Sequence, residues 1–323
     1  MLAFDKDQGI LLVEHNCEIR DSIARAIESN FMYSEVVVNI NLAKDLLQKK
    51  KFSVLILHII GEPCFEFLKS CADIYPQMRI VLIISEDFKE YIQKIEDSSE
   101  LKNIIALRPA LTNKELISTI KIIFNNTLFN INYIIEDVPE TIKINISDSK
   151  AKGDYIERAS NFLSHYNISN RLLNKMLSSI DELVMNIIYN APTNSKGEHI
   201  YKDLSRKERV LLSKEQAGVL TISHSLQYVG ISGFDPFGSI DFNTIIEHLK
   251  RCFLNKGRVQ INDKSGGSKI GLYQMYKYSD FFIVSKKPGK KTEFMLIFDL
   301  KLKDRLRSKY PKSFHYFEEK EES

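Results

Sequence analysis

Three polar residues recur at intervals of four in the second half of the chain: Glu182, Asn186 and Asn190. On a helix this spacing places all three on one side. Met185 and Tyr189 share that side, whereas a purely solvated face would carry Lys and Glu. A carboxylate and two amides among apolar neighbours indicate the wall of a pocket, where they can bind a polar ligand and move a proton.

A helix from about residue 171 to residue 190 has to position these side chains. Its other side carries an apolar stripe at helical spacing, which predicts packing against a sheet. The stripe consists of Leu173, Met176, Leu177, Ile180, Val184, Ile187 and Ile188. Strands are expected at 142–146, 218–222, 228–231, 281–285 and 293–300, with further helices at 156–166 and 242–253. Helices on one face of a mixed or antiparallel sheet predict an α/β sandwich.

Four short motifs accompany this pattern in a fixed order. They are Asp181 to Ala191, Asp235-Pro-Phe-Gly238, Gly266 to Tyr273 and Gly289 to Phe294. Over about residues 135–305 they resemble the N box, the two glycine boxes and the final Gly/Thr box of the GHKL superfamily. That superfamily includes histidine kinases, heat-shock-protein ATPases and anti-sigma-factor serine kinases, so the resemblance implies ATP and Mg²⁺ as cofactors.

The resemblance assigns three residues to the adenine end of such a site. Asp235 is expected to accept a hydrogen bond from the adenine amino group. Gly238 is expected to let the backbone pass close to the base. Thr292 adds a polar contact near the adenine.

At the phosphate end the resemblance places the helix residues and the second glycine box. Asn186 is expected to supply an oxygen to Mg²⁺, with Asn190 on the same nucleotide-binding face. Glu182 is the expected general base. Gly266, Gly267 and Gly271 are expected to offer backbone N–H groups to the phosphates, and Lys269 to contact a phosphate as a point charge.

Each motif also has an ordinary structural interpretation. Glu182 alone fits an exposed helix residue, and Asp235-Pro236 is a common turn signal. Gly266-Gly267 fits a flexible loop. Lys269 stands where the second glycine box usually has its middle glycine, and the first box has one glycine where the family commonly has two. These departures bear on hydrolysis more than on nucleotide binding.

The first half alternates short apolar runs with amphipathic stretches. Strands are expected at 10–13, 35–38, 54–57, 80–84 and 104–107, with helices between them. Near-continuous apolar strands separated by helices predict a doubly wound parallel sheet. Over roughly the first 125 residues this order resembles the flavodoxin-like receiver domain of response regulators.

The residues of a phosphorylation site are replaced in this receiver-like half. His58 stands at the end of the third strand, where receivers carry the phosphate-accepting aspartate, and Glu14-His15 stand where they carry two acids. We therefore predict a pseudo-receiver that docks or dimerises. A second hypothesis is that Glu14, His15 and His58, with Cys17 nearby, bind a transition metal; a decayed pocket filled by histidines is the simpler alternative.

Composition limits the remaining possibilities. The chain has 323 residues, 27% charged residues and a formal net charge of +3, too mild to indicate nucleic-acid binding. Four cysteines without a CxxC pair, no signal peptide and no membrane-length apolar run predict a cytoplasmic protein. The predicted organisation is a receiver-like domain at 1–127, an ATP-binding domain at 128–312 and a charged tail at 313–323.

The leading functional hypothesis is a signal-transduction regulator that binds ATP and Mg²⁺ and acts on a partner protein. Strand, helix and Asn167-Ile-Ser before the key helix resemble the anti-sigma-factor serine kinases, so the expected partner is a sigma-type or anti-anti-sigma-type regulator. The only histidine before that helix in the second half, His165, is expected to be structural, which argues against a histidine kinase. The alternative is a non-catalytic adaptor with a degenerate nucleotide site.

Overall fold

The computed structural model describes residues 9–31, 33–92, 94, 102–108, 112–131, 134–135, 140–254 and 271–319. Contacts divide the chain into two compact units, Met1–Thr127 and Leu128–Ser323. No helix among the described residues is long and apolar enough to cross a membrane.

The first unit is a parallel α/β fold with strands in the order β2-β1-β3-β4-β5. Its elements are β1 (Ile10–Val13), α1 (Cys17–Glu28), β2 (Ser34–Val37), α2 (Ile40–Leu47), β3 (Val54–His58), α3 (Glu62–Ile74), β4 (Arg79–Ile84), η1 (Phe88–Glu90), β5 (Asn103–Ala106) and α5 (Thr112–Asn125). This order is that of flavodoxin-like folds. The predicted doubly wound parallel sheet is therefore confirmed.

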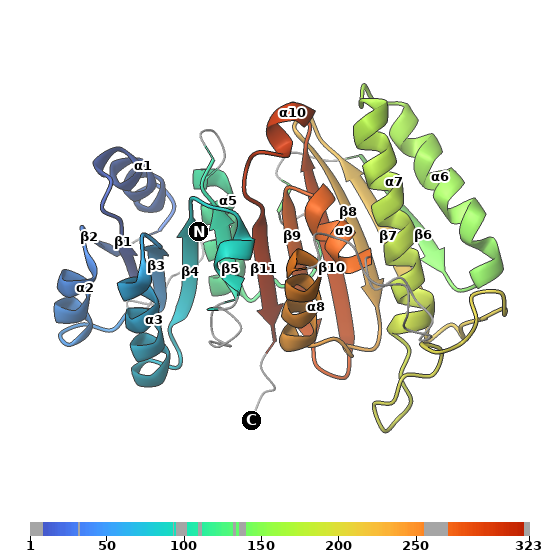
Figure 1. Cartoon of the computed structure of the whole chain (residues 1–323), viewed down its shortest axis with the longest axis horizontal. Helices are drawn as coiled ribbons and strands as arrows, with labels where there is room; N and C mark the ends of the chain where they lie inside the picture. Colours follow the sequence, from blue (N-terminus) through green and yellow to red (C-terminus); the bar gives the residue numbers. More distant parts are fainter. Residues whose placement is uncertain are drawn as a thin grey trace. The chain divides into compact units, whose positions relative to one another are not determined.

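Helices cover both faces of this sheet because its strands are apolar on both. β1 and β3 are buried along their whole lengths. On one face, Ile23 and Ile27 of α1 and Ile120 of α5 pack on the strands. Helices α2 and α3 lie on the other face (Figure 1). The carboxyl ends of β1, β3 and β4 thus share one edge of the sheet, where open α/β folds bind ligands.

The second unit contains a mixed sheet in the order β11-β9-β10-β8-β7-β6. Its elements are β6 (Glu140–Ile146), η3 (Ser149–Ala151), α6 (Lys152–Ser164), α7 (Asn170–Met185), η4 (Asn186–Asn190), β7 (Gly218–His224), β8 (Tyr228–Asp235), α8 (Phe242–Leu254), α9 (Gly271–Tyr278), β9 (Phe281–Lys287), β10 (Lys291–Asp299), α10 (Asp304–Arg307) and β11 (Ser313–Glu318). All pairings are antiparallel except that of β9 with β11, which is parallel.

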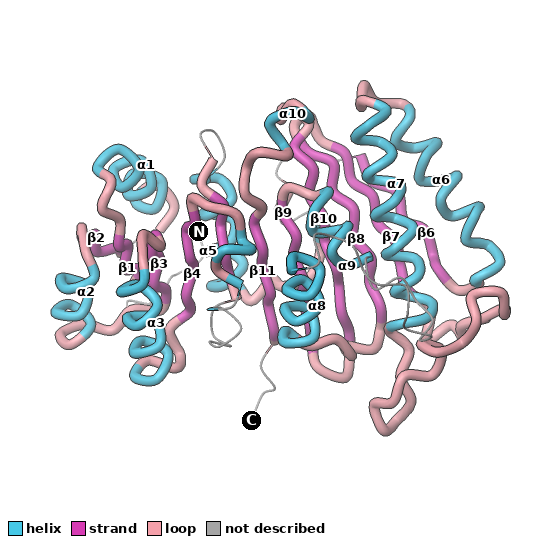
Figure 2. The backbone as a smooth tube through the Cα atoms, viewed as in Figure 1, coloured by secondary structure: helices cyan, strands magenta, loops and turns pink. Residues whose placement is uncertain are grey.

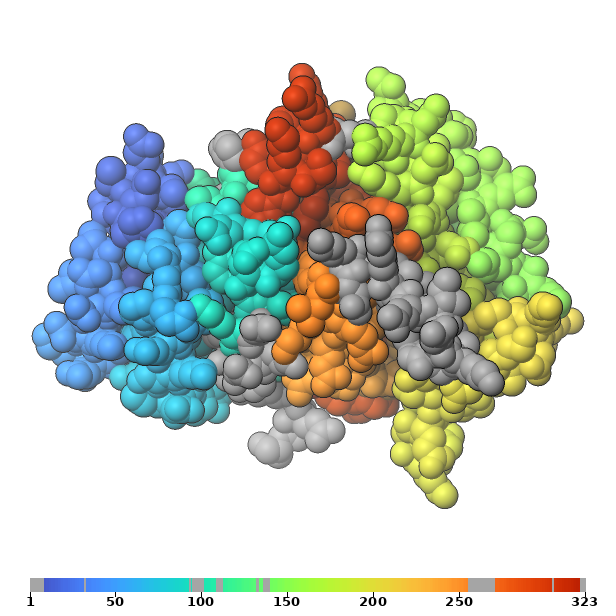
Figure 3. All heavy atoms as spheres, in the orientation of Figure 1, coloured from blue at the N-terminus to red at the C-terminus, as the bar shows by residue number. Residues whose placement is uncertain are grey.

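Helices α6, α7, α8 and α9 lie together over one face of this sheet (Figure 2). The apolar stripe of α7 faces the strands, and Leu183 approaches the backbone of Gly233 on β8 closely. The arrangement is a two-layer α/β sandwich, which puts the side of α7 that carries Glu182 next to α8 and α9. The long connection 191–217 projects beyond the helices as the yellow lobe of Figure 3.

The predicted charged tail at 313–323 is wrong over residues 313–318, which form β11. Its side chains from Ser313 to Phe317 are buried. Beside it lies a buried ionic network, in which Asp280 pairs with Arg307 and with Lys312. The acidic residues at the end of the sequence hid the signal of this strand, which pairs in parallel with β9.

The helix predicted at 171–190 ends as an α-helix at Met185. Residues Asn186–Asn190 form a π-helical turn, closed by a hydrogen bond from the Ala191 N–H to the Asn186 carbonyl oxygen at 2.8 Å. Such turns widen a helix by one residue and occur frequently at functional sites. This change in geometry affects two of the residues singled out from the sequence.

Candidate functional site

A pocket of about 380 Å³ lies on the helical face of the second unit. This volume falls within the usual range for small-molecule sites. The pocket is lined by Glu182, Asn186, Asn190, Ala191, His199, Lys202, Asp203, Asp235, Ser239, Ile240, Asp241, Thr244, His248, Arg251, Leu272, Thr292 and Phe294. It therefore brings together five of the residues singled out from the sequence: Glu182, Asn186, Asn190, Asp235 and Thr292.

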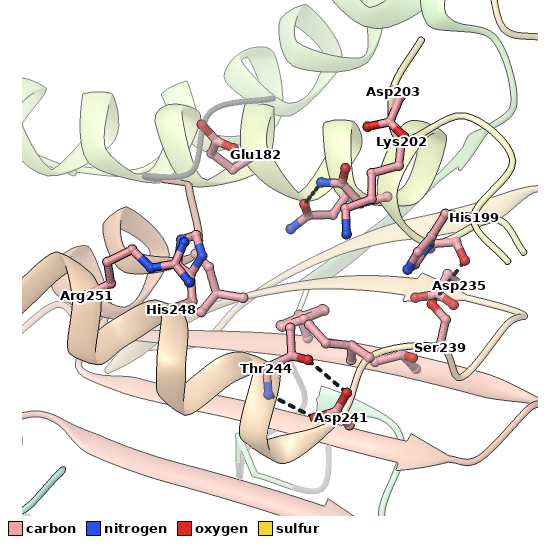
Figure 4. A pocket seen from close by; sticks show the side chains of 17 residues that line it. Glu182, His199, Lys202, Asp203, Asp235, Ser239, Asp241, Thr244, His248 and Arg251 are labelled. Carbon is pink, nitrogen blue, oxygen red and sulfur yellow. Dashed lines mark hydrogen bonds between the residues drawn. The ribbon is translucent and has the colours of Figure 1, made fainter. Parts of the chain in front are cut away.

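Asp235 provides a buried carboxylate at one end of the pocket (Figure 4). The backbone N–H groups of Phe237 and Gly238 both donate to its Oδ1, at 2.9 and 3.4 Å. Burial raises the pKa of Asp235 to about 6, although these two N–H groups oppose the rise. At neutral pH the group is mostly ionised and can accept a hydrogen bond from a donor in the pocket.

The residues beside Asp235 are held in place by the sheet and by a tight turn. Thr292 is its cross-strand neighbour on β10 and is also buried. Gly238 does not line the pocket. It adopts a φ of +64°, and a Cβ atom there would lie 2.2 Å from the carbonyl oxygen of Lys287. The requirement for glycine thus comes from packing against the β9–β10 turn.

Glu182 lies toward the other end of the pocket, on the same side of the view as Arg251 and His248 (Figure 4). Burial, followed by the charge of Asp181, raises the pKa of Glu182 to about 7, against the opposing effect of Lys152 and Arg206. A carboxyl group with this pKa is half ionised near neutrality, which suits a general base.

The Glu182 carboxylate rests against Gly271, the first residue of α9. A Cβ atom at position 271 would lie 1.9 Å from Glu182 Oε2, so no larger residue fits without moving the carboxylate. The structure therefore explains Gly271 by its contact with Glu182. Gly266, Gly267 and Lys269 lie outside the described residues.

Asn186 and Asn190 lie between the two ends, on the π-helical turn. The Asn190 Nδ2 donates a hydrogen bond to the Asn186 Oδ1 at 2.7 Å. This bond orients both amides along the pocket wall and leaves the second lone pair of the Asn186 oxygen for another partner. An amide oxygen in this position is a suitable ligand for Mg²⁺.

A separate polar cluster lies at the carboxyl edge of the first unit's sheet. Glu14 Oε2 is 2.8 Å from His58 Nδ1, and Glu14 Oε1 is 3.1 Å from His15 Nδ1. The ligand atoms of all three residues lie within 4.8 Å of one another. Cys17, which was expected nearby, does not belong to this group, so the thiolate part of the hypothesis is wrong. With His58 at the end of β3 there is no carboxylate there to accept a phosphoryl group.

Comparisons with known proteins concern the first unit. An orphan response regulator of H. pylori is 14% identical, covering 36% of this chain and 96% of that chain with a TM-score of 0.32. A response regulator from Thermotoga maritima is 15% identical, and the match covers 36% of this chain and 98% of that chain with a TM-score of 0.33. A chemotaxis response regulator of Vibrio cholerae is 19% identical, with coverages of 36% and 98% and a TM-score of 0.31.

No protein-family model and no curated protein matches the chain. These three solved structures are response regulators, and their coverage corresponds to a unit of the size of the first one. TM-scores this low carry no argument about activity. The receiver-like fold of this unit rests on its strand order, and the site in the second unit rests on its own geometry.

Sequence reasoning missed the pocket residues contributed by α8. Asp241 caps this helix by accepting hydrogen bonds from the Thr244 N–H and hydroxyl, both at 2.8 Å. Thr244, His248 and Arg251 follow at intervals of four and three, and all line the pocket. Their helical spacing was a usable signal, because the apolar residues 242, 245, 246, 249 and 252 mark the opposite side.

Proposed function

We propose that the second unit is a GHKL-type domain that binds ATP with Mg²⁺ and transfers its terminal phosphoryl group within signal transduction. The observation that carries this proposal is the placement of Asp235 and Glu182 toward opposite ends of one pocket (Figure 4), whose lining also includes the hydrogen-bonded Asn186–Asn190 pair. That order matches a nucleotide whose base and phosphates need different partners.

The Asp235 end suits an adenine base. Two backbone N–H groups hold the Asp235 carboxylate in place, and this carboxylate can accept a hydrogen bond from the exocyclic amino group. A guanine would present a carbonyl oxygen there, and two acceptors facing each other in a buried site are unfavourable. The pocket should therefore prefer ATP to GTP.

The Glu182 end suits the phosphates and the reaction. Asn186 would give its amide oxygen to Mg²⁺, and Arg251 and Lys202 would place positive charge near the phosphate oxygens. The bound nucleotide supplies the γ-phosphoryl group. Glu182 would take the proton of the attacking hydroxyl as the new P–O bond forms and ADP departs.

The acceptor that we propose is a Ser or Thr hydroxyl of a partner protein. The projecting connection 191–217 supports this, because its mostly exposed residues stand beside the pocket to which it contributes His199, Lys202 and Asp203. The receiver-like unit would serve docking or dimerisation. A non-catalytic adaptor is the second candidate, and the observation in its favour is that the Glu182 carboxylate packs on Gly271.

Calorimetric titration with ATP, with and without Mg²⁺, tests the nucleotide site. We expect one ATP per chain, tighter with Mg²⁺ and tighter than GTP. Asp235→Asn should weaken ATP by about 10-fold or more, the usual cost of a hydrogen bond to a charged group. Asp181→Asn, on the same helix as Glu182 but outside the pocket lining, is the matched control. No binding at millimolar ATP would refute the site, whereas binding without any phosphotransfer would favour the adaptor.

A further inference from the structure

The cluster at the edge of the first unit combines three metal-ligand groups of unequal exposure. Glu14 and His58 are buried, with relative exposures of 1% and 6%, whereas the His15 side chain is 48% exposed. Glu14 and His58, at the ends of the neighbouring strands β1 and β3, are thus buried beside His15, which is exposed to solvent. An ion can enter from the His15 side without any rearrangement of the core.

The three ligand groups of this cluster lie close enough to meet at one tetrahedral ion. Nitrogen and oxygen ligands about 2.1 Å from such an ion lie about 3.4 Å from one another. The Glu14–imidazole distances of 2.8 and 3.1 Å run to different carboxylate oxygens, Oε2 and Oε1. One ligand atom from each of the three residues lies within 4.8 Å of the other two, so small side-chain rotations bring all three to one ion. Two imidazoles on one such ion have ring centres about 5 Å apart, and the His15 and His58 rings are 5.5 Å apart.

Ser85 supplies the outer partner that a metal-bound imidazole needs. The Nδ1 of His58 is hydrogen-bonded to Glu14, and its Nε2 lies 2.8 Å from the Ser85 hydroxyl oxygen. If Nδ1 binds an ion, Nε2 carries the proton and donates it to Ser85. Such outer hydrogen bonds fix the tautomer and the ring orientation of ligating histidines.

The chemistry of the donors selects the class of ion. Two imidazoles with one carboxylate suit Zn²⁺, Co²⁺ or Fe²⁺, whereas Mg²⁺ prefers oxygen ligands and keeps several waters. We propose that Glu14, His15 and His58 bind one transition-metal ion, typified by Zn²⁺. Three protein ligands leave at least one coordination position open to water or to a further ligand, as in catalytic rather than structural zinc sites.

The test is titration of chelator-stripped, full-length protein with Zn²⁺ by calorimetry, together with the visible absorption of Co²⁺. We expect one ion per chain and the absorption bands of four-coordinate Co²⁺. His15→Ala should weaken binding by about 10-fold or more, and Ser85→Ala by about 10-fold, as for other outer partners of ligating histidines. Both residues are exposed, so neither change should impair folding.

His165→Ala is the matched control, because His165 is an exposed histidine on the other unit. It should bind Zn²⁺ as the unchanged protein does. Equal affinity in His15→Ala, or no stoichiometric binding of Zn²⁺ or Co²⁺, would overturn the site. Displacement of Zn²⁺ by an equal concentration of Mg²⁺ would overturn the choice of ion.

Discussion

Replacing Asp235 by Asn should stabilise the protein without nucleotide while weakening its binding of ATP. In the folded protein, burial raises the pKa of this carboxyl group from 3.8 to about 6. Between these two pH values, Asp235 is therefore protonated in the folded protein but ionised in the unfolded chain. The contribution of Asp235 to stability is most favourable below pH 4 and falls as the pH rises to 6, because burying the ionised carboxylate is unfavourable.

The size of the effect is set by the two pKa values. A difference of about two pH units corresponds to about 3 kcal/mol in the free energy of unfolding. Asn resembles the protonated carboxyl group in shape and never ionises, and its Oδ1 can still accept from Phe237 and Gly238. Asp235→Asn should therefore be more stable by about 3 kcal/mol at pH 8 and about equal at pH 3.5.

Scanning calorimetry of both proteins without ATP at a series of pH values measures this difference. For a domain of this size, about 3 kcal/mol raises the Tm by about 6–12 °C. Other titrating groups are common to both proteins and cancel. Asp154→Asn should show no such gain, because Asp154 is exposed on α6. A variant that is less stable at pH 8, or a difference that does not change with pH, would refute the reasoning.

Two further changes test the pocket. Glu182→Gln should lower ATP-dependent turnover by about 100-fold or more while leaving ATP affinity intact. In the unchanged enzyme, kcat/KM should rise with pH through an apparent pKa of about 7, because the proposed base acts in its ionised form. Turnover kinetics check this, and full activity in Glu182→Gln would exclude the proposed base. Gly238→Ala should cost about 1–3 kcal/mol for its backbone conformation and more for the contact at 2.2 Å with Lys287. Gly289→Ala, whose φ is also positive and whose Cβ position is open, should show only the first cost in denaturant unfolding, and equal losses would contradict the close approach.

The sequence predicted most of the elements because their signals are local. The strands of the first unit are continuous apolar runs, and Glu182, Asn186 and Asn190 share a helix side by spacing alone. β11 was missed because its pairing with β9 joins segments about thirty residues apart, and the acidic residues after Phe317 suggested a tail. Arg307 and Lys312 look like surface charges in the sequence, and only the fold places Asp280 between them.

The candidate pocket was predicted on one side only. The α7 wall is predicted by helical periodicity, whereas the wall made by α8 requires knowing that Thr244 and Arg251 line the same pocket as Glu182. The role of Gly238 was predicted from its motif as closeness to a base, but the structure shows closeness to Lys287. A motif identifies where glycine is required, and the packing of the chain identifies why.

The π-helical turn at Asn186–Asn190 makes the geometry of the site depend on the number of residues in the turn. Removing one residue from 187–189 would let the turn close as ordinary α-helix, because a π-helical turn holds one more residue than an α-helical turn. Asn190 would then stand three instead of four positions after Asn186, so the hydrogen bond between the two amides would have to form in a different geometry, although both residues would still be present. Scans of single substitutions would record this turn as tolerant wherever side-chain volume is kept, whereas scans of single-residue deletions should find it among the least tolerant places in the unit.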